Sequence, residues 1–104
     1  MKRNGKGKEY YSNEELSFEG EYLNGKWNGK GKEYNYDGNL SFEGEYLNGK
    51  RNGIGKEYHS NGNMRFFGEY KEGKKWNGIS NDEYEYTFDG PFKYSPSNSI
   101  SPLL

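Results

Sequence analysis

The sequence alternates between apolar and polar positions over short runs that are separated by turn residues. The run 40–46 places its leucine, phenylalanine, glycine and tyrosine on one side of an extended strand, and its serine and two glutamates on the other. The run 31–36 precedes it, and Asp37-Gly38 between the two runs is typical of a two-residue hairpin turn. The pattern predicts an antiparallel hairpin with one packed face and one solvent-exposed face.

This hairpin pattern recurs along the chain every 24 residues. Residues 4–27 and 28–51 are identical at 18 of 24 positions, and a third copy spans 52–76 with one extra residue near Lys74-Lys75. A degenerate copy over 77–94 is expected to cap the array, and 95–104, with two prolines and four serines, is expected to be a flexible tail. Asn48-Gly49 and Asn52-Gly53 mark the connection between units.

We therefore predict one all-β domain over 1–94, an antiparallel hairpin-repeat meander of seven or eight strands. It forms either an open, curled single sheet or a pair of sheets that meet face to face. The register in which opposed residue numbers sum to 75 sets Lys32 opposite Glu43 and Lys30 opposite Glu45, as two cross-strand ion pairs. It also places Glu33 beside Phe42 on the packed face, so we expect a β-bulge within 31–34.

The composition sharpens this picture. Tyr, Phe and Trp supply 19 of the 30 hydrophobic residues, and the chain has no Ala, Val or Cys. A helical bundle needs an aliphatic stripe that this composition lacks. The net charge of only -1 and the dense aromatics favour an ordered sheet over disorder. Because aliphatic residues are few, we expect the aromatic face to be completed by sheet curvature or by a second chain.

Other whole-chain features limit the compartment and the chemistry. No apolar run approaches the roughly 20 residues of a membrane span, and the amino terminus lacks the apolar core of a signal peptide. We expect a soluble chain, cytoplasmic by default. The absence of cysteine excludes a disulfide scaffold and thiol-rich zinc sites.

The unit G-x-x-x-x-Y-x-x-[ND]-G-x-L-x-x-E-G-x-Y-x-x-G-K, as in 29–50, resembles the MORN repeat (membrane occupation and recognition nexus). Its 24-residue spacing is similar to the variant common in bacteria, some of whose members are described as antitoxins. Glu14 stands where the turn glycine is expected, and Phe67 replaces the Glu of the E-G pair. The resemblance implies a hairpin array without catalysis of its own, used for interaction or scaffolding. Phospholipid binding has been proposed for the family, and it attaches to no defined position here.

Two sets of residues deserve comparison with enzymatic sites. Glu43 and Glu45 lie about 7 Å apart on one strand face, a separation that inverting glycosidases use. Glu19 and Glu21 repeat the pair in an identical setting with lysines positioned to neutralise it, so we interpret these glutamates as a solvated face. His59, the only histidine, has no cysteine with which to form a nucleophile-base pair or a metal cluster. We expect no enzymatic activity, no metal and no cofactor.

Candidate binding residues lie between the units and in the third copy. Trp27, Arg51 and Trp76 follow the Gly-Lys of successive copies, and Trp and Arg are enriched at binding hot spots. The alternative is that each covers the adjoining hairpin. A possible anion or lipid patch in the third copy consists of Arg65, Lys71, Lys74 and Lys75.

The distribution of charge along the chain makes some classes of binding partner more favourable than others. The three copies carry net charges of -2, 0 and +2, so no basic stripe follows the sheet, and we expect no nucleic-acid binding. We predict a non-catalytic scaffold that binds another protein or itself, as a homo-oligomer or part of a longer array. Its first strand presents an unpaired edge that Lys6 and Lys8 blunt. The alternatives are a module for anionic membrane surfaces and, from resemblance alone, an antitoxin or immunity-type protein that binds a toxin.

Overall fold

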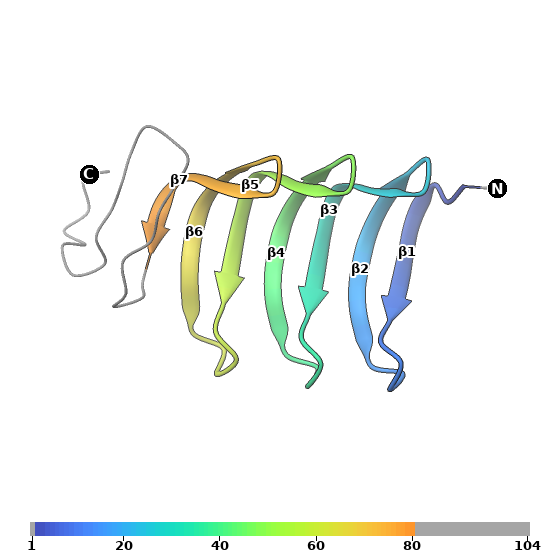
Figure 1. Ribbon diagram of the computed structural model, residues 1–104, viewed down its shortest axis with the longest axis horizontal. Coiled ribbons are helices and arrows are strands. Elements are labelled where there is room, and N and C mark those ends of the chain that lie inside the picture. The colour runs from blue at the N-terminus through green and yellow to red at the C-terminus, as the bar shows by residue number, and fades with distance from the viewer. Residues whose placement is uncertain (1, 81–104) are drawn as a thin grey trace.

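The computed structural model describes residues 2–80, which form one seven-stranded antiparallel sheet with its strands in chain order (Figure 1). The strands are β1 (Gly5–Tyr10), β2 (Leu16–Leu23), β3 (Lys26–Tyr34), β4 (Leu40–Leu47), β5 (Lys50–Tyr58), β6 (Met64–Lys71) and β7 (Lys74–Ser80). The predicted all-β meander is confirmed as a single open sheet. Within the described range no helix is long and apolar enough to cross a membrane. Of the expected cap over 77–94, residues 77–80 belong to β7; 81–94 and the tail 95–104 lie outside the described residues.

The predicted register of the second hairpin is confirmed. Lys32 lies opposite Glu43, Lys30 opposite Glu45 and Gly31 opposite Gly44. The register shifts between Glu33 and Tyr34, inside the range where a bulge was expected. The same shift follows Glu9 in β1 and Glu57 in β5, so the bulge is a constant part of the unit.

The turns inside the units differ from the two-residue turn predicted at Asp37-Gly38. The chain reverses over 35–38, where the Gly38 N–H donates to the Asn35 carbonyl at 2.9 Å, and the Asn35 N–H donates to the Asn39 carbonyl at 2.8 Å. The prediction was wrong because the bulge shifts the last pair to Tyr34 opposite Leu40, which leaves five residues to connect the strands.

The first of these turns forms without its glycine. Glu14 occupies the place of Gly38 and adopts the positive φ of 72° that the turn requires. Its N–H donates to the Tyr11 carbonyl at 2.9 Å, as the Gly38 N–H does to Asn35. A left-handed conformation costs a non-glycine residue about 1 kcal/mol or more, and the surrounding turn tolerates it here.

The turns between the units are tight two-residue turns. Asn48 and Gly49 both have positive φ, 52° and 86°, as a type I′ turn requires. The Gly49 N–H donates to the Trp27 carbonyl of the preceding unit at 2.8 Å, so each turn is fastened to the one before it. Asn52-Gly53, which was expected to belong to the connection, lies inside β5. There Gly53 has φ 105° and a second bulge interrupts the pairing with β4.

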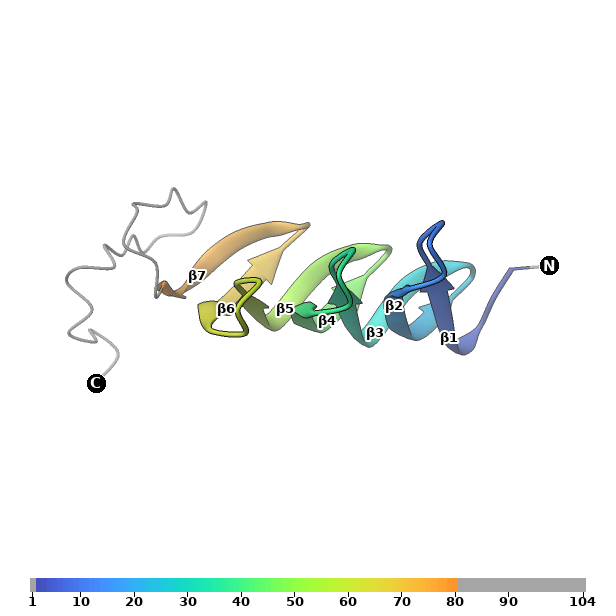
Figure 2. The same cartoon turned by 90° about the horizontal axis from the view of Figure 1, so that it is seen from below.

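The sheet coils around its long axis, as Figure 2 shows from below. The coiling encloses the aromatic side, where Phe18, Phe42 and Phe66 are at most 1% exposed and Tyr22, Tyr46 and Tyr70 are buried. Neighbouring rings meet edge to face, with centroids 5.0 Å apart for Phe42 and Tyr70. A Cβ on Gly31 would lie 2.7 Å from the Phe18 ring, so this glycine makes room for the core. Of the two expectations for the aromatic face, curvature completes it in the described part of the chain.

Candidate functional site

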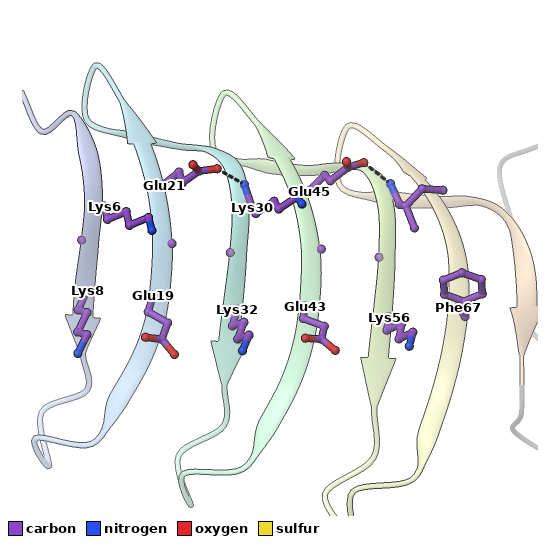
Figure 3. Close-up of a pocket in the computed structure, with 16 residues that line it drawn as sticks. Lys6, Lys8, Glu19, Glu21, Lys30, Lys32, Glu43, Glu45, Lys56 and Phe67 are labelled. Carbon is purple, nitrogen blue, oxygen red and sulfur yellow. Dashed lines mark hydrogen bonds between the residues drawn. The ribbon is translucent and has the colours of Figure 1, made fainter.

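The polar face of the sheet carries a groove of about 1040 Å³ that crosses β1 to β6 (Figure 3). Its floor is the backbone of the glycines at the strand centres, Gly7, Gly20, Gly31, Gly44 and Gly55. Charged side chains of alternating sign form two walls: Lys6, Glu21, Lys30 and Glu45 on one side, and Lys8, Glu19, Lys32, Glu43 and Lys56 on the other. The alternation follows from the strand period of two, because the residues that flank each glycine all point to this face.

The glutamates of the groove are held in place by the sheet itself. Glu21 Oε1 accepts a hydrogen bond from the Lys30 backbone N–H at 2.7 Å, which caps a backbone donor that the bulge leaves outside the ladder. Glu45 repeats this contact one unit later, with the Ile54 N–H at 2.7 Å. Two glutamates of the other wall accept from tyrosine hydroxyls, Glu19 from Tyr34 and Glu43 from Tyr58.

Burial and these contacts raise the pKa values of Tyr34 and Tyr58. Burial, followed by the hydrogen bond and charge of Glu19, raises the pKa of Tyr34 to about 12. Burial and Glu43 likewise raise the pKa of Tyr58 to about 12. Both hydroxyls therefore remain donors at neutral pH, and the carboxylates of this wall are fixed as acceptors.

The lysines of the groove are arranged differently from the expectation. The register sets Lys32 and Lys30 opposite their glutamates, but within residues 2–80 neither ammonium group lies within 4.0 Å of a carboxylate. The predicted ion pairs are thus longer-range attractions, because each glutamate turns toward the hydrogen bond it accepts. The ammonium groups are left to project into the groove beside fixed carboxylates (Figure 3).

The groove becomes apolar in the third unit. Ile54 stands where the second unit has Lys30, and Phe67 where it has Glu43; these side chains are 48% and 38% exposed. Lys56 Nζ lies 5.7 Å from the centroid of the Phe67 ring. The sequence showed that Phe67 breaks the E-G pattern, but its role needed the register. Phe67 lies opposite Lys56 in one wall and Ile54 opposite Glu69 in the other, so the two side chains line the same end of the groove from opposite walls.

Trp27 and Arg51, the predicted partner-binding residues, lie on the aromatic face and not in the groove. The Trp27 indole stacks on the Phe18 ring with centroids 4.0 Å apart and an interplanar angle of 5°, and its Nε1 donates to Glu9. The Arg51 guanidinium lies 4.0 Å from the centroid of the Phe42 ring. These two side chains cover the adjoining hairpin, which is the alternative that the sequence left open.

Glu33 lies opposite Phe42 on the packed face, as the predicted register required, and it holds the Arg51 side chain over the core. It accepts hydrogen bonds from Arg51 Nε and Nη2, both at 3.1 Å, and from the Tyr46 hydroxyl at 2.8 Å. Burial alone lowers the pKa of Arg51, but Glu33 outweighs it and the pKa is raised. Burial and Glu33 also raise the pKa of Tyr46 well above its ordinary value. The carboxylate is satisfied because Tyr46 and Arg51, from the two following strands of the same unit, supply its donors.

Trp76 does not hold the place expected for it. Lys75 takes the register position of Arg51, with Nζ 2.9 Å from Glu57 Oε1. Trp76 falls at a register shift, and Lys71 Nζ lies 4.6 Å from its ring centroid. The extra residue at 74–75 moves the tryptophan one position along the strand, which places its side chain on the opposite face from Trp27 and Arg51.

The residues of the predicted anion or lipid patch do not form one cluster. Lys75 and Arg65 both approach Glu57 Oε1, at 2.9 and 3.9 Å. Lys71 and Lys74 lie opposite each other beside the β6–β7 turn. The patch is therefore divided between the aromatic side, where a carboxylate offsets its charge, and the end of the hairpin.

The residues compared with enzymatic sites are also placed. Glu43 and Glu45 stand in opposite walls of the groove (Figure 3), and each accepts a hydrogen bond. His59 begins the β5–β6 turn, where its N–H donates to the Asn63 carbonyl at 2.9 Å. Within residues 2–80 no group of three or more His, Cys, Asp or Glu side chains is arranged to hold a metal ion.

Comparison with known proteins agrees with the hairpin periodicity. The model of the MORN repeat matches residues 2–14, 18–40 and 42–64, together more than half of the chain. A comparison with curated proteins gives no match. MORN repeats are generally protein- or membrane-interaction repeats. The matched segments, the 24-residue unit and the single open sheet of hairpins place this chain in the MORN repeat family.

Proposed function

We propose that the chain is a non-catalytic protein-interaction module that holds an extended segment of a partner protein in its groove. The groove carries this proposal. It combines ammonium groups that project into solvent, fixed carboxylates, and an apolar end at Ile54 and Phe67. Alternating charge selects a partner by complementarity, and an exposed aromatic and an exposed aliphatic side chain in opposite walls provide an anchor.

The shape of the groove supports a polymer as the ligand. Small-molecule sites are usually closed enough to bury most of the ligand. This groove instead runs across six strands between two charged walls. A partner segment that lies along it meets the walls of successive units in turn, so binding energy is distributed over the array.

The apolar end can be tested by exchanging its two residues for those of the second unit. The double variant Ile54→Lys and Phe67→Glu gives the third unit the wall residues of the second, so the sheet already shows that these residues fit. We expect capture of the partner from an extract of the source cells to fall at least tenfold. The control variant Leu23→Lys and Leu47→Lys changes two half-exposed leucines that do not line the groove, and it should capture normally. Equal capture by both variants would refute the proposal.

The membrane alternative has less support from the geometry. Two of its four residues, Arg65 and Lys75, approach Glu57. Sedimentation with anionic vesicles at low and at physiological salt tests it, because a charge-driven contact weakens as salt screens it. Pelleting that is lost on Lys71→Gln and Lys74→Gln, but kept in the groove variant, would favour a membrane surface over a protein partner.

The 24-residue unit supports a narrower version of the proposal, in which the chain is of the bacterial type and its partner is a toxin. The groove would then hold a segment of that toxin. The expected observation is a toxin encoded beside this chain, which the wild type captures and the groove variant does not. A neighbouring gene product that binds both equally would count against this version.

A further inference from the structure

The outer edge of β1 differs from the equivalent edges inside the sheet. In the second unit the first strand, β3, receives two contacts from the glutamates of β2: the Tyr34 hydroxyl donates to Glu19, and the Lys30 N–H donates to Glu21 at 2.7 Å. The third unit repeats both contacts between β5 and β4, with Tyr58 donating to Glu43 and Ile54 to Glu45, each at 2.7 Å. The first strand of a unit is therefore built to receive a strand with two glutamates that flank a glycine.

β1 carries the same receiving groups, and no strand in the described part of the chain lies on its outer side. Tyr10, the equivalent of Tyr34, is 59% exposed. Lys6 and Lys8 correspond to Lys30 and Lys32, and every residue of the strand except Gly7 is exposed. A repeated binding surface that is filled twice inside the sheet is thus present a third time at its edge.

We propose that the outer edge of β1 is a docking site for an antiparallel strand of another protein that carries two acidic residues in a Glu-x-Glu pattern. The added strand extends the sheet by main-chain hydrogen bonds, and its carboxylates meet Lys8, the Tyr10 hydroxyl and the Lys6 N–H. Lys6 and Lys8 also line the first-unit end of the groove, but this site consists of the strand edge and is distinct from the apolar end at Ile54 and Phe67 in the third unit.

Charge complementarity selects the occupant. Pairing of β1 with β1 of a second copy around Gly7 sets Lys6 opposite Lys8 twice, and a shift of two residues still opposes lysine to lysine. Like charges directly opposite each other destabilise a sheet. An acidic strand instead repeats the Lys–Glu opposition of β1 with β2, in which Lys8 lies opposite Glu19. The edge therefore favours an acidic partner strand over a second copy of this chain.

Arg3 adds a positive charge to this edge. Its Nη1 donates to the Lys8 carbonyl at 3.2 Å, and its guanidinium lies 4.9 Å from the centroid of the Tyr22 ring. An incoming strand takes over the Lys8 carbonyl with a backbone N–H and displaces this cap. The guanidinium stays on the aromatic side, over Tyr22, and the acidic side chains meet the lysines on the groove side.

The test uses a blocked peptide with the sequence of β4, Leu-Ser-Phe-Glu-Gly-Glu-Tyr-Leu, and a second peptide with lysine at both glutamate positions. Binding to the whole chain is followed by fluorescence anisotropy at low salt, and the site is mapped by backbone amide shifts. We expect the acidic peptide to bind at least tenfold more tightly than the basic one and to shift the amides of 5–10. The double variant Lys6→Gln and Lys8→Gln should remove most of this preference. Glutamine is chosen because it removes the positive charge but keeps a polar side chain opposite Glu19 and Glu21 of β2.

Two controls keep the result specific. Tyr10→Phe removes one exposed hydroxyl without touching the core, and it should weaken the acidic peptide severalfold. Lys26→Gln and Lys50→Gln remove the same charge at the turns between units and should leave affinity unchanged. Equal binding of the two peptides, or amide shifts confined to the apolar end of the groove around Ile54 and Phe67, would overturn the proposal. The groove variant of Ile54 and Phe67 should bind the acidic peptide normally, which separates the two sites.

Discussion

Arg51 lies over Phe42 and holds Glu33, so its replacement tests how the aromatic core is covered. Arg51→Ala removes two hydrogen bonds to the carboxylate at 3.1 Å and a guanidinium 4.0 Å from the ring centroid. Glu33 keeps only its bond from Tyr46. The alanine variant therefore exposes a core ring and leaves a half-buried carboxylate with fewer donors.

The magnitude follows from these contacts. Hydrogen bonds to a charged group contribute about 1.5–3 kcal/mol, and a partly exposed cation–π contact contributes about 1 kcal/mol. The Arg51 and Glu33 side chains are 24% and 23% exposed, so solvent screening places the sum near the lower limit. We expect Arg51→Ala to lower the free energy of unfolding by about 3 kcal/mol.

Arg51→Trp should cost much less, because the first unit already carries tryptophan at this position. Trp27 stacks on Phe18 and donates its Nε1 to Glu9 at 2.8 Å, the equivalent of Glu33. A tryptophan at position 51 can cover Phe42 and donate one hydrogen bond in the same way. Because Arg51 also donates a long hydrogen bond to Glu57 at 3.4 Å, the net loss is two hydrogen bonds, about 1 kcal/mol after solvent screening.

The assay is urea unfolding followed by far-UV circular dichroism, which an added tryptophan disturbs less than it disturbs fluorescence. The variants are compared by the midpoint and slope of the whole transition. The reasoning requires Arg51→Trp to be more stable than Arg51→Ala by about 2 kcal/mol. Equal stability of the two variants would refute it, since covering the ring would then contribute nothing.

Three further outcomes follow from the contacts of the sheet. Gly31→Ala places a Cβ 2.7 Å from a core ring and should lower the free energy of unfolding, measured in urea, by about 2 kcal/mol or more. Gly49→Ala meets open space and should cost about 1 kcal/mol, from its positive φ alone. The reverse order of the two variants would contradict the packing described. Burial and a nearby glutamate raise the pKa of Tyr46, so the folded state keeps a proton that the unfolded chain loses, and stability should fall as pH rises above about 10, with a smaller slope in Tyr46→Phe. Asn52→Ala removes the acceptor of the Glu72 N–H at 3.0 Å and should cost about 1 kcal/mol and speed exchange of that amide; an unchanged exchange rate would show that the cap has no effect.

The repeat made much of the sheet predictable. Two aligned copies fixed the alternation of each strand, and the opposition of Lys32 with Glu43 was enough to choose the register. A bulge near Glu33 was expected because the register that pairs the lysines with glutamates also places Glu33 beside Phe42; the structure has the bulge after Glu33, and hydrogen bonds from Tyr46 and Arg51 satisfy the carboxylate. These features depend on neighbours in one hairpin, which the sequence shows directly.

The errors arose where a residue has two uses or where the register depends on the next unit. A glycine with positive φ serves a bulge as well as a turn, so Gly53 could not be assigned from its type. The single extra residue near Lys75 changed which side chain covers Glu57. The groove was missed as a site because its apolar end comes from two strands, and only their pairing brings Ile54 and Phe67 together.

Each turn between units is hydrogen-bonded to the main chain of the unit before it, and this contact gives the array a constant repeat length. The Gly49 N–H reaches Trp27 and the Gly73 N–H reaches Arg51, each at 2.8 Å. One more 24-residue unit would lengthen the array by two strand spacings, about 10 Å, and leave every existing contact in place. A unit of odd length would exchange the groove and core faces beyond it unless a bulge absorbs the odd residue, as in the third unit, where Gly78 still lies opposite Gly68 and Ser80 opposite Phe66. The length of the array can therefore change only by whole units. The extra residue beside Trp76 is absorbed by a register shift within one strand pair.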